Sequence, residues 1–268
     1  MTAAHDATAH DATAPDAAAH NAAAHNAAAH NAAARREELS IRLRQVEERI
    51  GAACRAAGRS RGEVALIVVT KFFPVTDIEV LHHLGVRNIG ENRDQEASAK
   101  IAALPSEIRR GLQVHFIGQL QSNKAVSLAS YVDTVHSLDR EKLVRALDRA
   151  AAVAGRDIGA LVQVSLDREP AGGGRGGIPP DGVAELADSI AATQHLRLRG
   201  LMAVAPLGAD PAEAFAQLAT LSSAVRAGHP GATWISAGMS DDLEAAVANG
   251  ATHLRVGSAI LGSRPPFG

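Results

Sequence analysis

The sequence has almost no cysteine, no long apolar run and no excess of charge of one sign. Its single cysteine, Cys54, excludes an internal disulfide bond and a cysteine-based zinc cluster, and fits a reducing compartment. No apolar run approaches the roughly 18 to 20 residues that a membrane-spanning helix needs. With 27 Lys and Arg against 29 Asp and Glu, the net charge is −2, which argues against nucleic acid as the main partner. We therefore expect a cytoplasmic protein whose partners are neither membranes nor nucleic acids.

Residues 1–34 lack large apolar side chains apart from Met1. They repeat a five-residue unit built mainly from Ala, His, Asn, Asp and Thr. Such a segment buries too little apolar surface to offset the chain entropy lost on folding, so we predict a disordered tail. Its histidines recur every five residues, which fits no fixed coordination geometry, and we expect no metal site. Residues 35–268 are predicted to form one folded domain.

The rest of the chain alternates between helical and strand-like patterns. Apolar residues spaced three or four apart predict an amphipathic helix over 35–58, with Gly58 as its C-terminal stop. Residues 64–70 form a continuous apolar, β-branched run, typical of a strand buried on both faces of a parallel sheet. Seven further strands are predicted at 87–89, 113–117, 131–135, 158–165, 196–202, 233–236 and 253–256. Helices are predicted between them at 76–84, 92–103, 120–129, 139–153, 181–192, 210–227 and 240–248.

Eight strands with intervening helices fit a (β/α)8 barrel in both order and length. A doubly wound open sheet has the same local pattern and remains the alternative. We favour a single (β/α)8 TIM barrel with an N-terminal helix and a disordered N-terminal tail. The reason is that polar or glycine residues follow the C-terminal ends of seven strands, where barrel enzymes build their sites.

Lys71 follows the most apolar of the predicted strands. The chain has only four lysines against 23 arginines, so a lysine here departs from its preference for arginine. Partial burial would lower the pKa of the Lys71 amine and allow it to attack a carbonyl and form a Schiff base. The alternative is a lysine that extends from a strand end into solvent.

Polar and glycine residues gather at the ends of the last two predicted strands. The residues concerned are Ser236, Gly238, Arg255, Gly257 and Ser258. Backbone N–H groups at a helix N-terminus after such a strand favour an anion, although helix capping alone would give a similar pattern. A lysine amine opposite a phosphate site indicates a ligand that has both an aldehyde and a phosphate. Pyridoxal 5′-phosphate and sugar phosphates both fit that description.

Seven blocks of sequence occur in a characteristic order. They are Val69-Thr-Lys71-Phe-Phe-Pro74, Ile89-Gly-Glu-Asn92, His115-Phe-Ile-Gly-Gln-Leu-Gln-Ser-Asn-Lys124, His136-Ser137, Gly200-Leu-Met202, Ser236-Ala-Gly-Met-Ser-Asp-Asp242 and Arg255-Val-Gly-Ser-Ala-Ile-Leu-Gly262. Over about residues 36–264 the chain closely resembles the pyridoxal phosphate homeostasis protein family. That family is a single-domain relative of the N-terminal barrel of alanine racemase.

The resemblance implies a pyridoxal 5′-phosphate cofactor held as an internal aldimine on Lys71. It also implies that Asn92 lines the cofactor ring and that Arg255 lies beside the pyridine nitrogen. The residues that it implies for the phosphate are Ser236, Gly238, Gly257 and Ser258. Met202 is expected either near the cofactor or in the core.

The sequence departs from the family pattern in two places. The loop after the fifth strand usually carries a Lys-Ser-Gly-like element, whereas here residues 171–177 are rich in glycine and contain Arg175. We assign this loop no role. Gln119 stands where relatives often have His or Pro, which we regard as tolerable.

We expect a carrier of the cofactor that takes part in intracellular pyridoxal phosphate homeostasis, with no catalytic residues. A racemase needs acid–base groups on both faces of the substrate carbon, and Tyr131, the only tyrosine, precedes the fourth predicted strand. His115, His136 and Lys124 are candidate bases, but such residues are more often structural. The chain ends ten residues after Ser258, so we expect no second, β-rich domain of the racemase type.

The expected partners are the cofactor and pyridoxal phosphate-dependent apo-enzymes, and we expect a monomer. A racemase or a Schiff-base lyase remains the enzymatic alternative. A phosphate-sensing interaction protein, which would bind no cofactor, is the third possibility.

Overall fold

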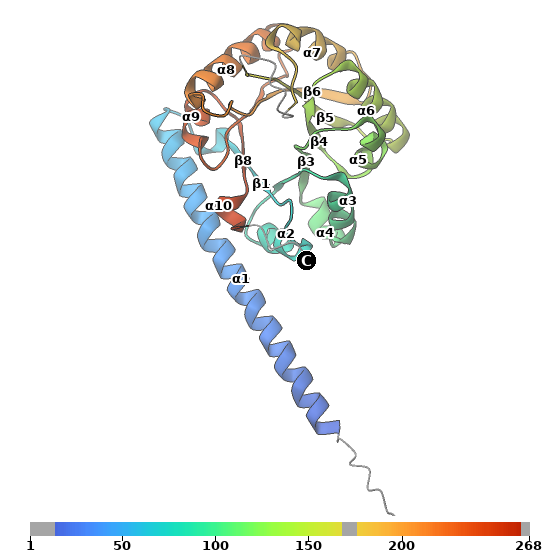
Figure 1. Ribbon diagram of the computed structural model, residues 1–268, viewed down its shortest axis with the longest axis vertical. Coiled ribbons are helices and arrows are strands. Elements are labelled where there is room, and N and C mark those ends of the chain that lie inside the picture. The colour runs from blue at the N-terminus through green and yellow to red at the C-terminus, as the bar shows by residue number, and fades with distance from the viewer. Residues whose placement is uncertain (1–13, 168–175, 264–268) are drawn as a thin grey trace, which may run out of the picture.

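The computed structural model describes residues 14–167 and 176–263, and its strands form a closed parallel barrel. The strands follow one another around the barrel in chain order, and β8 pairs with β1 to close it (Figure 1). They are β1 (Ala65–Val69), β2 (Asn88–Glu91), β3 (Gln113–Phe116), β4 (Thr134–Leu138), β5 (Ile158–Gln163), β6 (Leu196–Met202), β7 (Trp234–Ser236) and β8 (His253–Val256). The predicted (β/α)8 barrel is confirmed, and the open sheet is excluded.

Helices surround the strands on the outside of the barrel (Figure 1). They are α2 (Val75–His83), α3 (Asp94–Ala103), α4 (Ser106–Arg110), α5 (Ala125–Tyr131), α6 (Glu141–Ala154), α7 (Val183–Ala191), α8 (Pro211–Gly228), α9 (Leu243–Ala248) and α10 (Ser258–Leu261). Short 3-10 helices occur at Arg61–Glu63, Ser122–Lys124 and Pro180–Gly182. The predicted helices are present. Helices α4 and α10 were not predicted, because each is too short to give a periodic apolar pattern.

Several predicted boundaries were wrong, including the start of α5, which lies at Ala125 rather than at 120 because a 3-10 helix, Ser122–Lys124, precedes it. Strand β4 begins at Thr134 rather than at 131, since Tyr131 is the last residue of α5, where its ring is buried. The strand preference of an aromatic residue is overridden here by packing. His136 therefore lies within β4 instead of after it. Helix α9 begins at Leu243 rather than at 240, because the preceding residues form a turn in which Met239 N–H donates to Asp242 Oδ1 over 2.6 Å.

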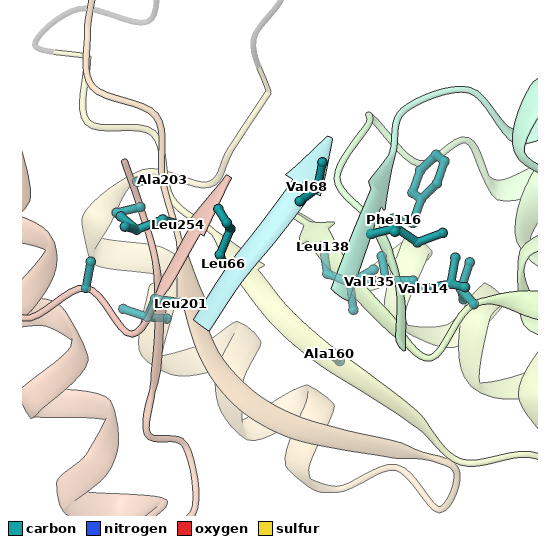
Figure 2. Packing of buried hydrophobic residues seen from close by; sticks show 14 of the residues in the cluster. Leu66, Val68, Val114, Phe116, Val135, Leu138, Ala160, Leu201, Ala203 and Leu254 are labelled. Carbon is teal, nitrogen blue, oxygen red and sulfur yellow. The ribbon is translucent and has the colours of Figure 1, made fainter. Parts of the chain in front are cut away.

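Apolar side chains from strands and helices form one large buried cluster. Figure 2 shows part of it, with labelled side chains from six of the strands and their ends. On β1, Leu66 and Val68 belong to this cluster, whereas Val69 lines a pocket at the end of the strand. Because successive side chains of a strand point to opposite sides, β1 contributes both to the core and to the pocket.

Helix α1 (Ala14–Ala56) is longer than the sequence analysis predicted. Its packed part is confirmed, because Leu39, Leu43, Val46, Ile50 and Cys54 are buried; Gly58 follows the helix with a φ of 65°. The structure differs from the predicted disordered tail over 14–34, which continues the same helix beyond the barrel (Figure 1). Alanine has the highest helix propensity, and adding residues to an existing helix is far easier than starting one. Residues 1–13 lie outside the described part of the chain.

Arginines attach α1 to the end of the barrel where the strands finish. Arg35 donates two hydrogen bonds to the buried Asp77 carboxylate, of 3.1 and 2.6 Å, and a third of 3.1 Å to the backbone oxygen of Leu261. Arg49 contacts both carboxylate oxygens of Glu244 and donates to the backbone oxygen of Ser240 over 2.6 Å. Helix α1 therefore braces the segments that follow β7 and β8.

Among the described residues, no helix combines the length and apolar character needed to cross a membrane.

The Arg35 contact predicts a measurable loss of stability on substitution. Arg35→Ala leaves Asp77, whose side chain is 5% exposed, without its charged donor. We expect the free energy of unfolding to fall by about 2 kcal/mol, the cost of an unpaired buried acceptor. Urea unfolding measures the change, and Arg44→Ala, an exposed site on the same helix, should stay within about 0.5 kcal/mol of wild type. Equal stability of the two variants would contradict the bracing role.

Candidate functional site

A pocket of about 340 Å³ opens where β1 and β8 end. Four residues singled out in the sequence line it, namely Lys71, Arg255, Gly257 and Ser258. Phe72, Phe73 and Met239 contribute apolar walls. The volume and the mixture of apolar walls with a few polar groups are those of a small-molecule site. The structure thus brings together a lysine and an arginine that the sequence separates by most of the domain.

Lys71 follows the end of β1 by two residues, and both Val69 and Lys71 line the pocket. It belongs to a turn closed by Phe73 N–H, which donates to the Thr70 carbonyl over 3.1 Å. Phe72, directly after the lysine, has a φ of 71°, the only positive value of a non-glycine residue in the described part of the chain. This conformation costs about 1 to 2 kcal/mol for a residue with a side chain.

Arg255 lies on β8 and is only 5% exposed. Its Nη1 donates to Ser236 Oγ over 2.7 Å, and its Nη2 donates to the Ala203 carbonyl over 2.9 Å. Burial lowers the pKa of Arg255 to about 10, so the guanidinium still carries its charge at neutral pH. A guanidinium has no acceptor atom, and Arg255 therefore offers only N–H donors to a ligand in the pocket.

A chain of buried hydrogen bonds runs from Arg255 across the barrel. Ser236 Oγ lies 3.0 Å from His136 Nδ1, and His136 Nε2 lies 2.9 Å from His115 Nδ1. His115 Nε2 then lies 3.1 Å from Asn88 Oδ1. The five side chains come from β8, β7, β4, β3 and β2, and together they link opposite parts of the barrel wall.

The two ends of this row of hydrogen bonds determine which atom donates the proton in each bond. Arg255 only donates and Asn88 Oδ1 only accepts. The Ser236 hydroxyl therefore donates to His136 Nδ1, and each imidazole carries its single proton on Nε2. Burial lowers the pKa of His115 to about 3 and that of His136 well below its usual range, so both rings are neutral at physiological pH. Neither ring is a base that faces the pocket, because both nitrogens of each are engaged in the chain.

Two of the predicted phosphate residues are not among those that line the pocket. Ser236 is fully buried, and its hydroxyl accepts from Arg255. Gly238 has a φ of 91°, and an added Cβ would lie 2.6 Å from Ala246 Cβ, so only glycine fits this close approach. That these two residues hold a phosphate stays a prediction.

Other predicted residues lie outside the pocket as well. Asn92 and Lys124 line a separate hollow at the ends of β2 and β3, where Lys124 Nζ is 3.8 Å from Asp94 Oδ2. The Tyr131 hydroxyl donates to the same Asp94 carboxylate over 3.2 Å. Met202 is buried at the end of β6. Arg175 and most of the glycine-rich loop lie outside the described residues.

The sequence analysis missed a charged cluster beside the Lys71 turn. Lys100 Nζ lies 2.7 Å from Glu91 Oε1 and 2.9 Å from Glu96 Oε1. Glu91 is fully buried, and burial raises its pKa although Lys100 opposes the shift. A carboxylate inside a strand-end block was the available signal, since buried carboxylates are rare unless paired. The sequence carried no comparable signal for Lys100, because a lysine on a helix is usually a surface residue.

With this geometry established, comparison with known proteins identifies the family. The sequence profile described as "Alanine racemase, N-terminal domain" matches residues 41–265. A Mycobacterium tuberculosis protein named "Pyridoxal phosphate homeostasis protein" is 44% identical over 243 residues, which cover 86% of this chain and 94% of that protein. This chain belongs to the pyridoxal phosphate homeostasis protein family. The resemblance carried by the seven sequence blocks is therefore confirmed.

Solved structures agree with the family assignment. PipY from Synechococcus elongatus, determined with PLP bound, is 34% identical to this chain and superposes with a TM-score of 0.70. The match covers 84% of this chain and all of PipY. A protein of unknown function from Bifidobacterium adolescentis is 33% identical, with a TM-score of 0.79, and the match covers 85% of this chain and 96% of that one. The barrel is thus the fold of the family.

The buried histidines predict how stability depends on pH. In the unfolded chain a histidine takes up a proton as the pH falls through about 6.5. In the folded protein, burial lowers the pKa of His115 to about 3 and that of His253 to about 4. Below pH 6.5 the unfolded state therefore binds more protons than the folded state. The free energy of unfolding consequently decreases as the pH is lowered. Urea unfolding at pH 7 and pH 5.5 should show a loss of about 1 kcal/mol for each such histidine.

A variant at His253 isolates one of these contributions. His253→Gln keeps a polar group for the Thr252 hydroxyl, which lies 2.8 Å from His253 Nδ1. The variant should lose about 1 kcal/mol less than wild type between the two pH values. If its loss equals that of wild type, His253 does not contribute as a neutral buried ring.

Proposed function

We propose that the protein binds pyridoxal 5′-phosphate in the pocket of Lys71 and Arg255. We further propose that it holds this cofactor and passes it to pyridoxal phosphate-dependent apo-enzymes, acting as a monomer without sustained turnover. The observation that carries the proposal is the presence of an amine and a fixed guanidinium in one small pocket. The names of the relatives and the PLP bound in PipY support it.

The donor set fits the three chemical features of the cofactor. The Lys71 amine suits the aldehyde, and the N–H groups of Arg255 suit the ring nitrogen. Gly257 and Ser258, where α10 begins, suit the phosphate, because the first N–H groups of a helix have no partner within it. A Cβ added at Gly257 would lie 3.2 Å from the Val69 carbonyl oxygen, so a side chain here would crowd this corner of the pocket.

Lys71 is the residue that we propose for the covalent link. When bound, the cofactor supplies an aldehyde for amine capture and a ring that withdraws electrons. The Lys71 amine would be the nucleophile toward that aldehyde, and the pocket would hold it in place for the covalent link. The pocket keeps the lysine beside the ring of Phe72, whose centroid is 6.0 Å from Nζ.

Arg255 favours a carrier over a catalyst. A guanidinium that donates to the ring nitrogen gives up no proton at neutral pH, so the nitrogen stays unprotonated. An unprotonated ring is a weaker electron sink for carbanion chemistry. Because Ser236 and Ala203 each accept a hydrogen bond from Arg255, the guanidinium is held in place and stays a donor.

The second candidate is an amino-acid racemase or a Schiff-base lyase, and the alanine racemase N-terminal profile is the observation that favours it. Racemisation requires acid–base groups on both faces of the substrate carbon. Tyr131 donates to Asp94, and the rings of His115 and His136 bond to each other inside the barrel. Within the described residues, none of these three lines the pocket as a second base.

Substitution of Lys71 tests the covalent link. With pyridoxal 5′-phosphate added, the purified protein should show the visible absorbance of a C=N bond, and borohydride should fix the label on the peptide that contains Lys71. Lys71→Ala should lose both signals, because no amine remains at that place. Lys142→Ala, at an exposed lysine on α6, is the matched control and should keep both. A band that persists unchanged in Lys71→Ala would overturn the assignment, and peptide mapping would then identify the lysine responsible.

Incubation with amino acids distinguishes the carrier from the enzyme. We expect no accumulation of the opposite enantiomer or of a cleavage product beyond the amount of protein present, because none of Tyr131, His115 and His136 lines the pocket in the described part of the chain. Chiral chromatography of the reaction measures this directly. Product formation that continues over many equivalents would favour the racemase or the lyase.

A further inference from the structure

The turn that carries Lys71 is strained. It spans residues 70–73 and is closed by the hydrogen bond from Phe73 N–H to the Thr70 carbonyl. Phe72 occupies the third position of the turn with a φ of 71°, which is the place where a type II turn normally has glycine or asparagine. Such a conformation persists only where the surroundings hold it, and it is often found at functional sites.

The charged cluster missed by the sequence analysis surrounds this turn. Lys100 Nζ donates to the Thr70 carbonyl over 2.9 Å and to the Phe73 carbonyl over 3.3 Å, so one amine contacts both ends of the turn. Glu96 Oε1 accepts the Phe72 N–H over 2.6 Å, which engages the strained residue itself. Glu96 and Lys100 also bond to each other over 2.9 Å.

Glu91, the last residue of β2, joins the cluster to the barrel. Its Oε1 accepts from the Thr70 hydroxyl over 2.6 Å and lies 2.7 Å from Lys100 Nζ. Its Oε2 is buried and has no hydrogen-bond partner in the described structure. Lys100, at 10% side-chain exposure, therefore forms an ion pair with a buried carboxylate, and its hydrogen bonds go to the two backbone oxygens of the turn and to Glu96.

We propose that Lys100 and Glu96 are positioning residues that hold the strained 70–73 turn and thereby keep the Lys71 amine in the pocket. This inference rests on the proposed function of Lys71. Neither residue lines the Lys71 pocket in the described structure, and both act through the backbone on either side of the lysine. A purely structural cluster would stabilise the fold equally but would have no specific effect on the reactivity of Lys71.

The test compares Lys100→Met with the double variant Lys100→Met/Phe72→Gly. The first readout is hydrogen exchange of the peptide that contains residues 70–73, without cofactor. The second is the rate at which added pyridoxal 5′-phosphate is trapped on Lys71 by borohydride. Lys100→Met should raise the hydrogen exchange of this peptide and lower the trapping rate, each by about tenfold. A factor of ten corresponds to about 1.4 kcal/mol, which is the size of the backbone strain at Phe72.

Phe72→Gly should restore the trapping rate in the Lys100→Met background, because glycine adopts positive φ without strain. Because removing the strain also raises the free energy of unfolding, urea unfolding of the same variants shows whether the recovered rate is local to the turn or follows overall stability. Lys142→Met, at an exposed lysine, is the matched control and should behave as wild type. If Lys100→Met does not fold, Glu96→Ala removes the acceptor of the Phe72 N–H from a partly exposed site, and the same rescue applies.

Two results would overturn the proposal. One is a trapping rate in the Lys100→Met or Glu96→Ala variant within about twofold of wild type. The other is a slow rate that Phe72→Gly leaves unchanged. Failure of the proposed function is distinguishable, because it would appear as unlabelled wild-type protein or as labelling that persists in Lys71→Ala. Labelling that depends on Lys71 but not on Lys100 would reject only the positioning role.

Discussion

The pairing of β1 with β8 is the contact on which the candidate site depends. It closes the barrel and places Ile67 in register with Arg255. One residue beyond the paired segment, Gly257 packs against Val69 so closely that an added Cβ would lie 3.3 Å from the Cβ of Val69. Because parallel strands all finish at the same end of a closed barrel, this pairing brings the turn after the first strand to the segment after the last. Lys71 and Arg255 line one pocket for that reason.

Two polar systems of different character support the two key side chains. Arg255 is held by a chain of uncharged groups inside the barrel, which ends at Asn88. Every member of that chain has a partner, as burial in a low-dielectric interior requires. The Lys71 turn is instead held by charged groups around Lys100. The neutral network places no additional charge beside Arg255, whereas the charged cluster bonds to the backbone of the Lys71 turn through Lys100 Nζ and Glu96 Oε1.

Helix α1 extends this support beyond the barrel itself. Arg35 bonds to the last residue of α10, and Arg49 bonds to the segment after β7. Both segments lie next to the pocket, which Ser240 and Ser258 help to line. The helix added before the first strand therefore helps to fix the shape of the site. Residues 29–34 of the same helix are exposed, and their helicity follows from alanine content rather than from packing.

The sequence by itself determined the order of strands and helices and the family, and it singled out Lys71 and Arg255, which the structure places in one pocket. Buried parallel strands have continuous apolar patterns, and the blocks at their ends are distinctive. It did not determine that His136 lies inside β4, that Ser236 bonds to Arg255 or that Lys100 contacts the Lys71 turn. Those relations join residues from different strands and helices, and no local pattern records which side chains meet across a barrel. Only closure of the sheet, which fixes register and the direction of each side chain, decided them.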